Sequence, residues 1–390
     1  MSLSIGDFAP WSIVPSTAHP QHHVDLVSGH RTVLFFFGSG SSPEVRTVLN
    51  RFLNSATLWR SQGVSFLGIS IDPRDNVLET TCLDPTCAIL WDFDGILSQQ
   101  YGVCQIDTAN GGGIAYDPTT LVLDENLRVL GIFPLDRHVD PVAQVAKLLE
   151  QLSPVPPPTQ VTRQAPILLI PNVFELEFCQ HLMNLYHADG GQESGFMRRM
   201  GDQTVEVSDP AVKQRRDLRI TEPSLIGQIN QRIWRRVKPE VEKAFHFNIS
   251  NFERYLVGCY DDKTAGFFKP HRDNTSVGTL HRRFAMTLNL NAGYAGGYLR
   301  FPEYGSLYRP APGEAAIFSC SLLHEATPVT QGQRFALLSF FYNEEDAKVR
   351  EKNKAHVILK PTDASSAPGG NSVTLGQPPT GFQPKSQKKK

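Results

Sequence analysis

Apolar runs and amphipathic segments alternate through the first 150 residues of the chain. Residues 31–37 (R-T-V-L-F-F-F) are a continuous apolar run, which is typical of a strand buried on both faces. Residues 43–61 place apolar side chains at helical spacing, and residues 63–71 predict a second buried strand. The alternation predicts an α/β domain with a central sheet. Its remaining predicted elements are strands 120–123 and 129–133, which form a hairpin, and an amphipathic helix over 139–152.

The hydrophobic pattern changes in the second half of the chain. Residues 174–186 and 224–245 have helical spacing, but from residue 254 onward short apolar runs recur between Gly, Pro and Asn. Many short strands at such spacing indicate a sandwich or a double-sheet jelly roll with flanking helices. These strands are predicted over 254–260, 267–271, 284–290, 298–301, 315–320 and 334–342.

Two segments divide the chain. Residues 153–164 (S-P-V-P-P-P-T-Q-V-T-R-Q) are rich in proline and predict a semi-rigid linker. Residues 357–390 are rich in Ser, Pro, Gly and Lys, so we expect a disordered tail whose final lysines are solvated. The sequence therefore predicts an α/β domain over 1–152 and a second, α+β domain over 165–350.

Composition limits the class of protein. The 390 residues are 40% hydrophobic and 20% charged, as in a globular protein, and the formal net charge is -1. Such a balance gives no electrostatic reason to expect nucleic acid or an anionic membrane as a partner. No signal peptide or membrane-spanning run is evident, and six sparse cysteines suggest reduced thiols. We therefore expect a cytoplasmic protein.

The strongest candidate chemistry lies in G-F-F-K-P-H-R-D-N, where His271 and Asp273 form an H-x-D motif. On an extended segment, residues two apart point to the same face, so both side chains can approach one point. The motif alone arises easily by chance, but His324 follows after another predicted strand. Two imidazoles and one carboxylate form the facial triad of non-haem Fe(II) oxygenases, which leaves three octahedral positions open. We therefore predict an iron site at these three residues.

A buried cation accompanies this predicted site. Arg334 begins the apolar strand R-F-A-L-L-S-F-F-Y, where burial of a permanent charge is costly unless it meets an anion. The distal carboxylate of 2-oxoglutarate is such an anion, and a planar guanidinium can bind it through two hydrogen bonds. Thr287 and Asn289 share one face of their strand and either add hydrogen bonds to this cosubstrate or are ordinary sheet polars.

The region 260–342 resembles the 2-oxoglutarate/Fe(II)-dependent dioxygenase family, in particular its prolyl 4-hydroxylase-like branch. The family's ligands match His271, Asp273 and His324, its basic residue matches Arg334, and Tyr260 resembles the tyrosine that lines its cosubstrate pocket. A G-G-x-L-x-F strand and a P-x-P-G-x-A turn also match, at 296–301 and 310–315. One departure is Asn289, which stands where some prolyl hydroxylases carry a second tyrosine.

This resemblance implies a double-stranded β-helix and hydroxylation of an unactivated C–H bond by O2. In that reaction 2-oxoglutarate is converted to succinate and CO2, and L-ascorbate often keeps the iron reduced. The branch suggests a prolyl or another protein residue as substrate.

Residues 5–152 resemble the thioredoxin-like fold of peroxiredoxins and bacterioferritin comigratory proteins. The matching segments are G-D-F-A-P at 6–10, V-L-F-F-F and T-T-L-V-L-D at 119–124. Val45 stands where that family has its peroxidatic cysteine, and Pro118 replaces its usual arginine. Because a thiolate is the nucleophile of that chemistry, we expect a redox-inactive domain for docking or recognition.

Three interpretations compete. The leading one is a two-domain hydroxylase. The second is a non-catalytic interaction or scaffold protein built from two degenerate domains, which the intact triad and Arg334 disfavour. The third is a thiol peroxidase or disulfide reductase, in which Cys82 and Cys87 would form a redox pair, and the valine at position 45 disfavours it.

Overall fold

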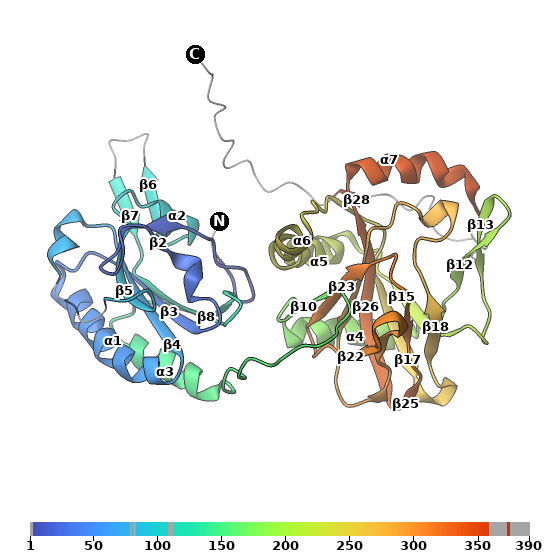
Figure 1. The fold of residues 1–390 in the computed structure, drawn as a ribbon, viewed down its shortest axis with the longest axis horizontal. Coiled ribbons are helices and arrows are strands. Elements are labelled where there is room, and N and C mark those ends of the chain that lie inside the picture. Colours follow the sequence, from blue (N-terminus) through green and yellow to red (C-terminus); the bar gives the residue numbers. More distant parts are fainter. Residues whose placement is uncertain (1–2, 79, 81–82, 108–112, 359–372, 375–390) are drawn as a thin grey trace, which may run out of the picture. The chain divides into compact units, whose positions relative to one another are not determined.

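A computed structural model describes residues 3–78, 80, 83–107, 113–358 and 373–374. The chain divides into two compact units, Met1–Thr159 and Gln160–Lys390, which are described separately below (Figure 1). The division falls within the proline-rich segment 153–164, which contains no helix or strand. Among the described residues, no helix is long and apolar enough to cross a bilayer.

The N-terminal unit is built on a five-stranded sheet. Its helices and strands are β1 (Ile13–Val14), β2 (His22–His23), β3 (Arg31–Gly38), α1 (Pro43–Ser61), β4 (Val64–Ser70), β5 (Cys87–Trp91), α2 (Ile96–Gln100), β6 (Cys104–Asp107), β7 (Gly113–Tyr116), β8 (Thr119–Leu123), β9 (Val129–Pro134) and α3 (Pro141–Gln151). The sheet order is β5-β4-β3-β8-β9, with β3, β4 and β5 parallel and β8 and β9 each antiparallel to the preceding neighbour. The arrangement is the predicted α/β, thioredoxin-like one.

Strand β3 lies at the centre of this sheet and is buried on both faces, as its apolar run predicts. Phe35 and Phe37 pack with α1 and α3, while Leu34 and Phe36 pack with α2 on the other face. Helix α1 begins where expected, because Ser42 accepts a hydrogen bond from the backbone of Val45 and Pro43 occupies the first turn.

The C-terminal unit contains many short strands and four α-helices within its described part. Its first half comprises β10 (Ile167–Ile170), α4 (Leu176–Asp189), β11 (Gln192–Glu193), β12 (Phe196–Met200), β13 (Gln203–Val207), β14 (Lys213–Gln214), β15 (Arg216–Arg219), α5 (Pro223–Arg236), α6 (Lys238–Phe245), β16 (Asn251–Phe252) and β17 (Leu256–Asp261). Its second half comprises β18 (Phe267–His271), β19 (Phe284–Asn289), β20 (Ala295–Gly296), β21 (Leu299–Phe301), β22 (Ser306–Tyr308), β23 (Ala315–Ser319), β24 (His324–Ala326), β25 (Val329–Gln331), β26 (Gln333–Tyr342), α7 (Glu344–Asn353), β27 (Val357–Ile358) and β28 (Val373–Thr374).

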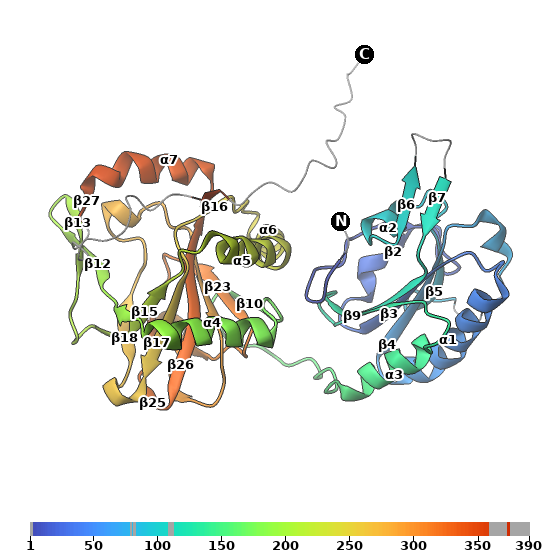
Figure 2. The same ribbon diagram turned by 180° about the vertical axis from the view of Figure 1, so that it is seen from behind.

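Two antiparallel sheets form the centre of this unit. The larger has the order β10-β23-β19-β26-β17-β15-β11, and the smaller has the order β14-β18-β24-β21-β22. Helices α4, α5 and α6 cover one face of the larger sheet (Figure 2), where Leu182, Ile233 and Val241 pack against strand residues such as Leu337. The opposite face meets the smaller sheet, because Ala285 and Phe318 of the one pack with Leu299 and Phe301 of the other.

The expectation that residues 224–245 are helical is confirmed, although they form two helices, since the chain breaks at Val237 between α5 and α6. Pro239 explains the break: its ring would clash with the carbonyl four residues earlier in a continuous helix. Within the segment 357–390, where we expect a disordered tail, β27 and β28 pair with β13 and β16. The rest of that tail lies outside the described residues.

The turn before β23 provides a test of the fold. Gly313 has a φ of +80°, and a Cβ there would lie 2.3 Å from the carbonyl oxygen of Phe174. Gly305 also has a positive φ, +64°, but a Cβ there meets nothing within 4 Å. We expect Gly305→Ala to lower the free energy of unfolding by about 1 kcal/mol, from backbone strain alone. Gly313→Ala should cost a further ~1–3 kcal/mol through overpacking, measured by urea denaturation. Equal losses would contradict the close packing.

Candidate metal centre

His271 and His324 face each other across the smaller sheet. His271 ends β18 and lies directly opposite His324 at the start of β24, and the two rings are 4.3 Å apart between centroids. The register between these strands shifts after Phe268, so β18 contains an irregularity just before the histidine. Pro270, which lacks a backbone donor, lies in this irregular stretch. Such irregularities often re-aim a side chain at a site.

Asp273 reaches the same point from a turn. The expectation that His271 and Asp273 share one extended segment is wrong, because β18 ends at His271 and Asp273 lies in the turn that follows. The carboxylate nevertheless lies 3.5 Å from Nε2 of His271 and 3.3 Å from Nε2 of His324. One potential ligand atom from each of the three residues lies within 4.8 Å of the others.

Backbone carbonyls set the tautomers of both histidines. Nδ1 of His271 lies 2.7 Å from the carbonyl oxygen of Lys269, and Nδ1 of His324 lies 3.0 Å from that of Leu322. A carbonyl oxygen only accepts hydrogen bonds, so each Nδ1 carries the proton and donates it. Each Nε2 therefore faces Asp273 and is the ring nitrogen available as a metal ligand. Metal-binding histidines are commonly oriented in this way.

The protonation states also suit a cation. Burial disfavours the charged form of Asp273, but His324 and His271 beside it outweigh this effect and lower its pKa to about 2. Burial lowers the pKa of His324 to about 4, against the opposing attraction of Asp273. At neutral pH the cluster therefore offers a carboxylate and a neutral imidazole, which are the forms that ligate divalent metals.

The donor set fits a divalent metal ion. Bonds of about 2.1 Å place neighbouring ligand atoms about 3 Å apart, close to the distances found here. Two imidazole nitrogens and one carboxylate are the donor types of the facial triad of non-haem iron sites. His271, Asp273 and His324 could thus hold Fe(II).

Arg334 lies on the inner face of the larger sheet, where strand alternation also places Thr287 and Asn289. Its guanidinium donates to Oδ1 of Asn289 over 3.4 Å and to Oγ1 of Thr287 over 3.3 Å, and it lies 5.4 Å from the ring centre of Tyr260. Arg334 is 3% exposed, and among the described residues no carboxylate lies within ion-pair distance of it. The structure thus places Tyr260, Thr287 and Asn289 around Arg334, so that all four residues predicted to bind a cosubstrate lie together. The groups that Arg334 contacts there are neutral.

Sequence reasoning missed a second buried cation beside Tyr260. Arg215 donates to the Tyr260 hydroxyl over 3.2 Å and forms a two-contact ion pair with Asp217, at 2.6 and 2.7 Å. In the sequence Arg215 stands in a basic run with Arg216 and Arg219, and such a run usually indicates a solvated face. Arg216 and Arg219 are exposed as this pattern indicates, but the side chain of Arg215 is not. No sequence signal separates it from its neighbours except the alternation of the strand.

No thiol lies at the position in the N-terminal unit where the resemblance would place a peroxidatic cysteine. Val45 lies in the first turn of α1 and is buried with the core residues of that face. Cys104 is a free buried thiol, and burial raises its pKa, so it lacks the thiolate character of a reactive cysteine. The expectation of reduced thiols is wrong for Cys87, which is disulfide-bonded. Cys82 lies outside the described residues.

Comparisons with known proteins agree with this division of the chain. Residues 5–131 match the AhpC/TSA family. A PKHD-type hydroxylase of Maricaulis maris is 31% identical over 116 residues, which cover 27% of this chain. The chain spans 52% of the length of that curated relative. An AhpC/TSA-like domain thus forms the N-terminal part, and the relative gives weak support for a hydroxylase-like C-terminal part.

Parts of the chain also show similarity, at low TM-scores, to solved structures, including the following two. A viral collagen prolyl hydroxylase from Paramecium bursaria Chlorella virus-1 has a TM-score of 0.35 and 15% identity, over 45% of this chain and 94% of its own. The peroxidoxin BcpB of Mycobacterium tuberculosis has a TM-score of 0.32 and 21% identity, over 38% of this chain and 95% of its own.

The geometry predicts that divalent metal binding depends on His324. We expect His324→Ala to weaken Co(II) binding by more than the roughly 10–100-fold that loss of an outer-shell partner costs, because a ligand itself is removed. Isothermal titration calorimetry measures the dissociation constant. His356→Ala is the matched control, since that histidine is exposed and outside the cluster. Equal affinity of the two variants would contradict the site.

Proposed function

We propose that this chain is an Fe(II)- and 2-oxoglutarate-dependent dioxygenase that hydroxylates an unactivated C–H bond. The observation that carries this proposal is the convergence of the His271 and His324 Nε2 atoms with the Asp273 carboxylate. The C-terminal unit is the catalytic domain, and its two facing antiparallel sheets form the double-stranded β-helix of this class. The N-terminal unit is a redox-inactive docking module, and 153–164 is the linker.

The residues of the site have distinct roles in this proposal. His271, Asp273 and His324 would hold the metal, and a set of three protein ligands would leave other coordination positions for the cosubstrate and O2. Iron at such a site, with 2-oxoglutarate and O2, supplies an oxidant that hydroxylates C–H bonds while releasing succinate and CO2. L-ascorbate is the expected reductant that keeps the iron ferrous.

Arg334 binds the distal carboxylate of 2-oxoglutarate. A guanidinium that is 3% exposed and contacts neutral groups retains an uncompensated charge, so an incoming carboxylate gains a strong pairing there. Thr287 and Tyr260 line the same space and can add neutral hydrogen bonds. Asn289 has a different role, because its amide nitrogen donates to the carbonyls of Asn291 and Pro310 and its oxygen accepts from Arg334. It therefore holds the arginine rather than the cosubstrate.

The substrate is assigned only by class. The prolyl hydroxylase-like motifs favour a prolyl or another residue of a protein as the group that is hydroxylated. A non-catalytic scaffold of two degenerate domains is the alternative, and the presence of an uncompensated buried arginine in the same unit as the three candidate ligands disfavours it.

Turnover of 2-oxoglutarate without substrate tests the proposal directly. We expect the purified chain to convert 2-oxoglutarate slowly to succinate in the presence of Fe(II), O2 and ascorbate, measured by mass spectrometry. His271→Ala should abolish this conversion and His356→Ala should leave it unchanged. A chain that neither forms succinate nor binds 2-oxoglutarate in the presence of metal would favour the scaffold.

The role of Arg334 predicts a selective effect on the cosubstrate. Losing one partner of a buried charge pair costs about 2–5 kcal/mol, so Arg334→Met should raise the KM for 2-oxoglutarate by roughly 30-fold or more. The Fe(II) concentration for half-maximal turnover should change little, because the arginine is not a ligand. Arg300→Met, at an exposed arginine paired with Glu325, is the control. Equal losses for iron and 2-oxoglutarate would argue against this role.

A further inference from the structure

The position of the Asp273 carboxylate depends on two backbone hydrogen bonds of its turn. Its N–H donates to the carbonyl oxygen of Cys320 over 3.0 Å, and its own carbonyl oxygen accepts from Nη1 of Arg282 over 3.2 Å. Cys320 follows β23 directly and Arg282 shortly precedes β19, two neighbouring strands of the larger sheet. The turn is therefore tied to the larger sheet, while His271 and His324 belong to the smaller one.

Arg282 is itself held rigidly. Its Nε donates to Oε1 of Glu253 at 2.5 Å and its Nη2 donates to Oε2 of the same carboxylate at 2.9 Å. The guanidinium also lies 3.9 Å from the ring centre of Phe340 on β26. A planar guanidinium fixed by a two-contact carboxylate and an aromatic ring has little freedom to rotate. Its remaining nitrogen, Nη1, is thereby aimed at the carbonyl of Asp273.

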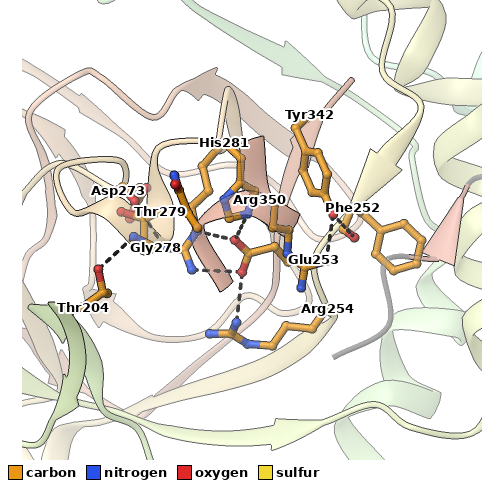
Figure 3. A network of polar contacts seen from close by, with 12 residues as sticks. Thr204, Phe252, Glu253, Arg254, Asp273, Gly278, Thr279, His281, Tyr342 and Arg350 are labelled. Atoms are coloured by element: carbon orange, nitrogen blue, oxygen red, sulfur yellow. Dashed lines mark hydrogen bonds and ion pairs between the residues drawn. The ribbon is translucent and has the colours of Figure 1, made fainter. Parts of the chain in front are cut away.

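Glu253 is the centre of this network (Figure 3). Besides Arg282, it accepts hydrogen bonds from Nε2 of His281 at 2.8 Å and from Nη1 of Arg254 at 3.0 Å. The carboxylate is buried, and the three donors fix its orientation from different directions. The pKa of Glu253 lies well below its usual range, because Arg282, His281 and Arg254 outweigh the effect of burial.

We propose that Arg282, oriented by Glu253, is a positioning residue that fixes the Asp273 carboxylate against the two histidines for metal binding. This inference rests on the proposed function, since it assigns Asp273 as a ligand. Arg282 acts through the backbone of Asp273 and does not contact the metal or the cosubstrate. The contact thereby keeps the larger and the smaller sheet in the relative position that the three ligands require.

Stability alone does not account for this network. Burying ions costs desolvation energy that their mutual attraction often fails to exceed, so apolar residues can serve a core equally well. The chain itself offers a comparison: Arg236 is also buried, pairs with Glu175 at 2.8 Å and donates to the carbonyl of Val173 at 2.8 Å. That arginine lies on α5, on the face of the larger sheet that the helices cover. Both arginines are buried, and each binds a carboxylate and a backbone carbonyl. Only in Arg282 does that carbonyl belong to a candidate metal ligand, Asp273.

The test compares Arg282→Met with Arg236→Met in the full chain. Co(II) affinity is measured by calorimetry and the absorption spectrum of bound Co(II) reports the ligand geometry, after circular dichroism has shown that each variant is folded. We expect Arg282→Met to raise the Co(II) dissociation constant about 10–100-fold, as loss of an outer-shell partner typically does, and to alter the spectrum. Arg236→Met should lower stability but leave both Co(II) readouts as in the wild type.

A milder variant keeps the test decisive if Arg282→Met does not fold. Glu253→Gln preserves shape while weakening the hold on Arg282, and it should shift the Co(II) spectrum and affinity in the same direction. Wild-type affinity and spectrum in the folded Arg282 or Glu253 variant would overturn the positioning role while leaving the proposed function intact. Failure of the wild-type chain to bind Co(II) through His271 would overturn both.

Discussion

The antiparallel pairing of β18 with β24 is the interaction on which the candidate site depends. It places His271 directly opposite His324, so that two imidazoles from distant parts of the sequence share one face of the smaller sheet. Without this register neither the carbonyl partners of their Nδ1 atoms nor the approach of Asp273 would bring three ligand atoms together. A shift of one residue would turn His324 to the other face of the sheet.

Three arginines of the C-terminal unit differ in whether a carboxylate compensates their charge. Arg282 and Arg215 each meet a carboxylate, Glu253 and Asp217, and each holds a second group that belongs to the site. Arg334 meets only neutral oxygens and an aromatic ring among its described contacts. The first two cations are compensated within the protein and can serve as supports. The third has no such partner among the described residues, and in the proposed function it is the cation that binds the cosubstrate carboxylate.

Local sequence patterns predicted much of this arrangement and missed what depends on long-range contacts. Helix α1 and strand β18 agree with the predicted ranges, because helical spacing and alternation are local properties. Strand β24 is too short and too polar to be recognised, although it carries His324. The position of Asp273 was expected from strand periodicity but arises in a turn. Glu253 and Arg282 could not be singled out, since nothing in a sequence shows that a charged residue will be buried against its partner.

The two units differ in how they use buried polar groups. In the N-terminal unit the first turn of α1 places Val45 in the core, so this segment contributes apolar packing where related proteins need a reactive sulfur. In the C-terminal unit the space between the sheets contains histidines, a carboxylate and arginines, each satisfied by a specific partner or left for a ligand. Because burying such groups is expensive, their presence between the sheets is one reason why we place the proposed chemistry in the C-terminal unit. In the proposed function the thioredoxin-like unit serves as a docking surface for that chemistry.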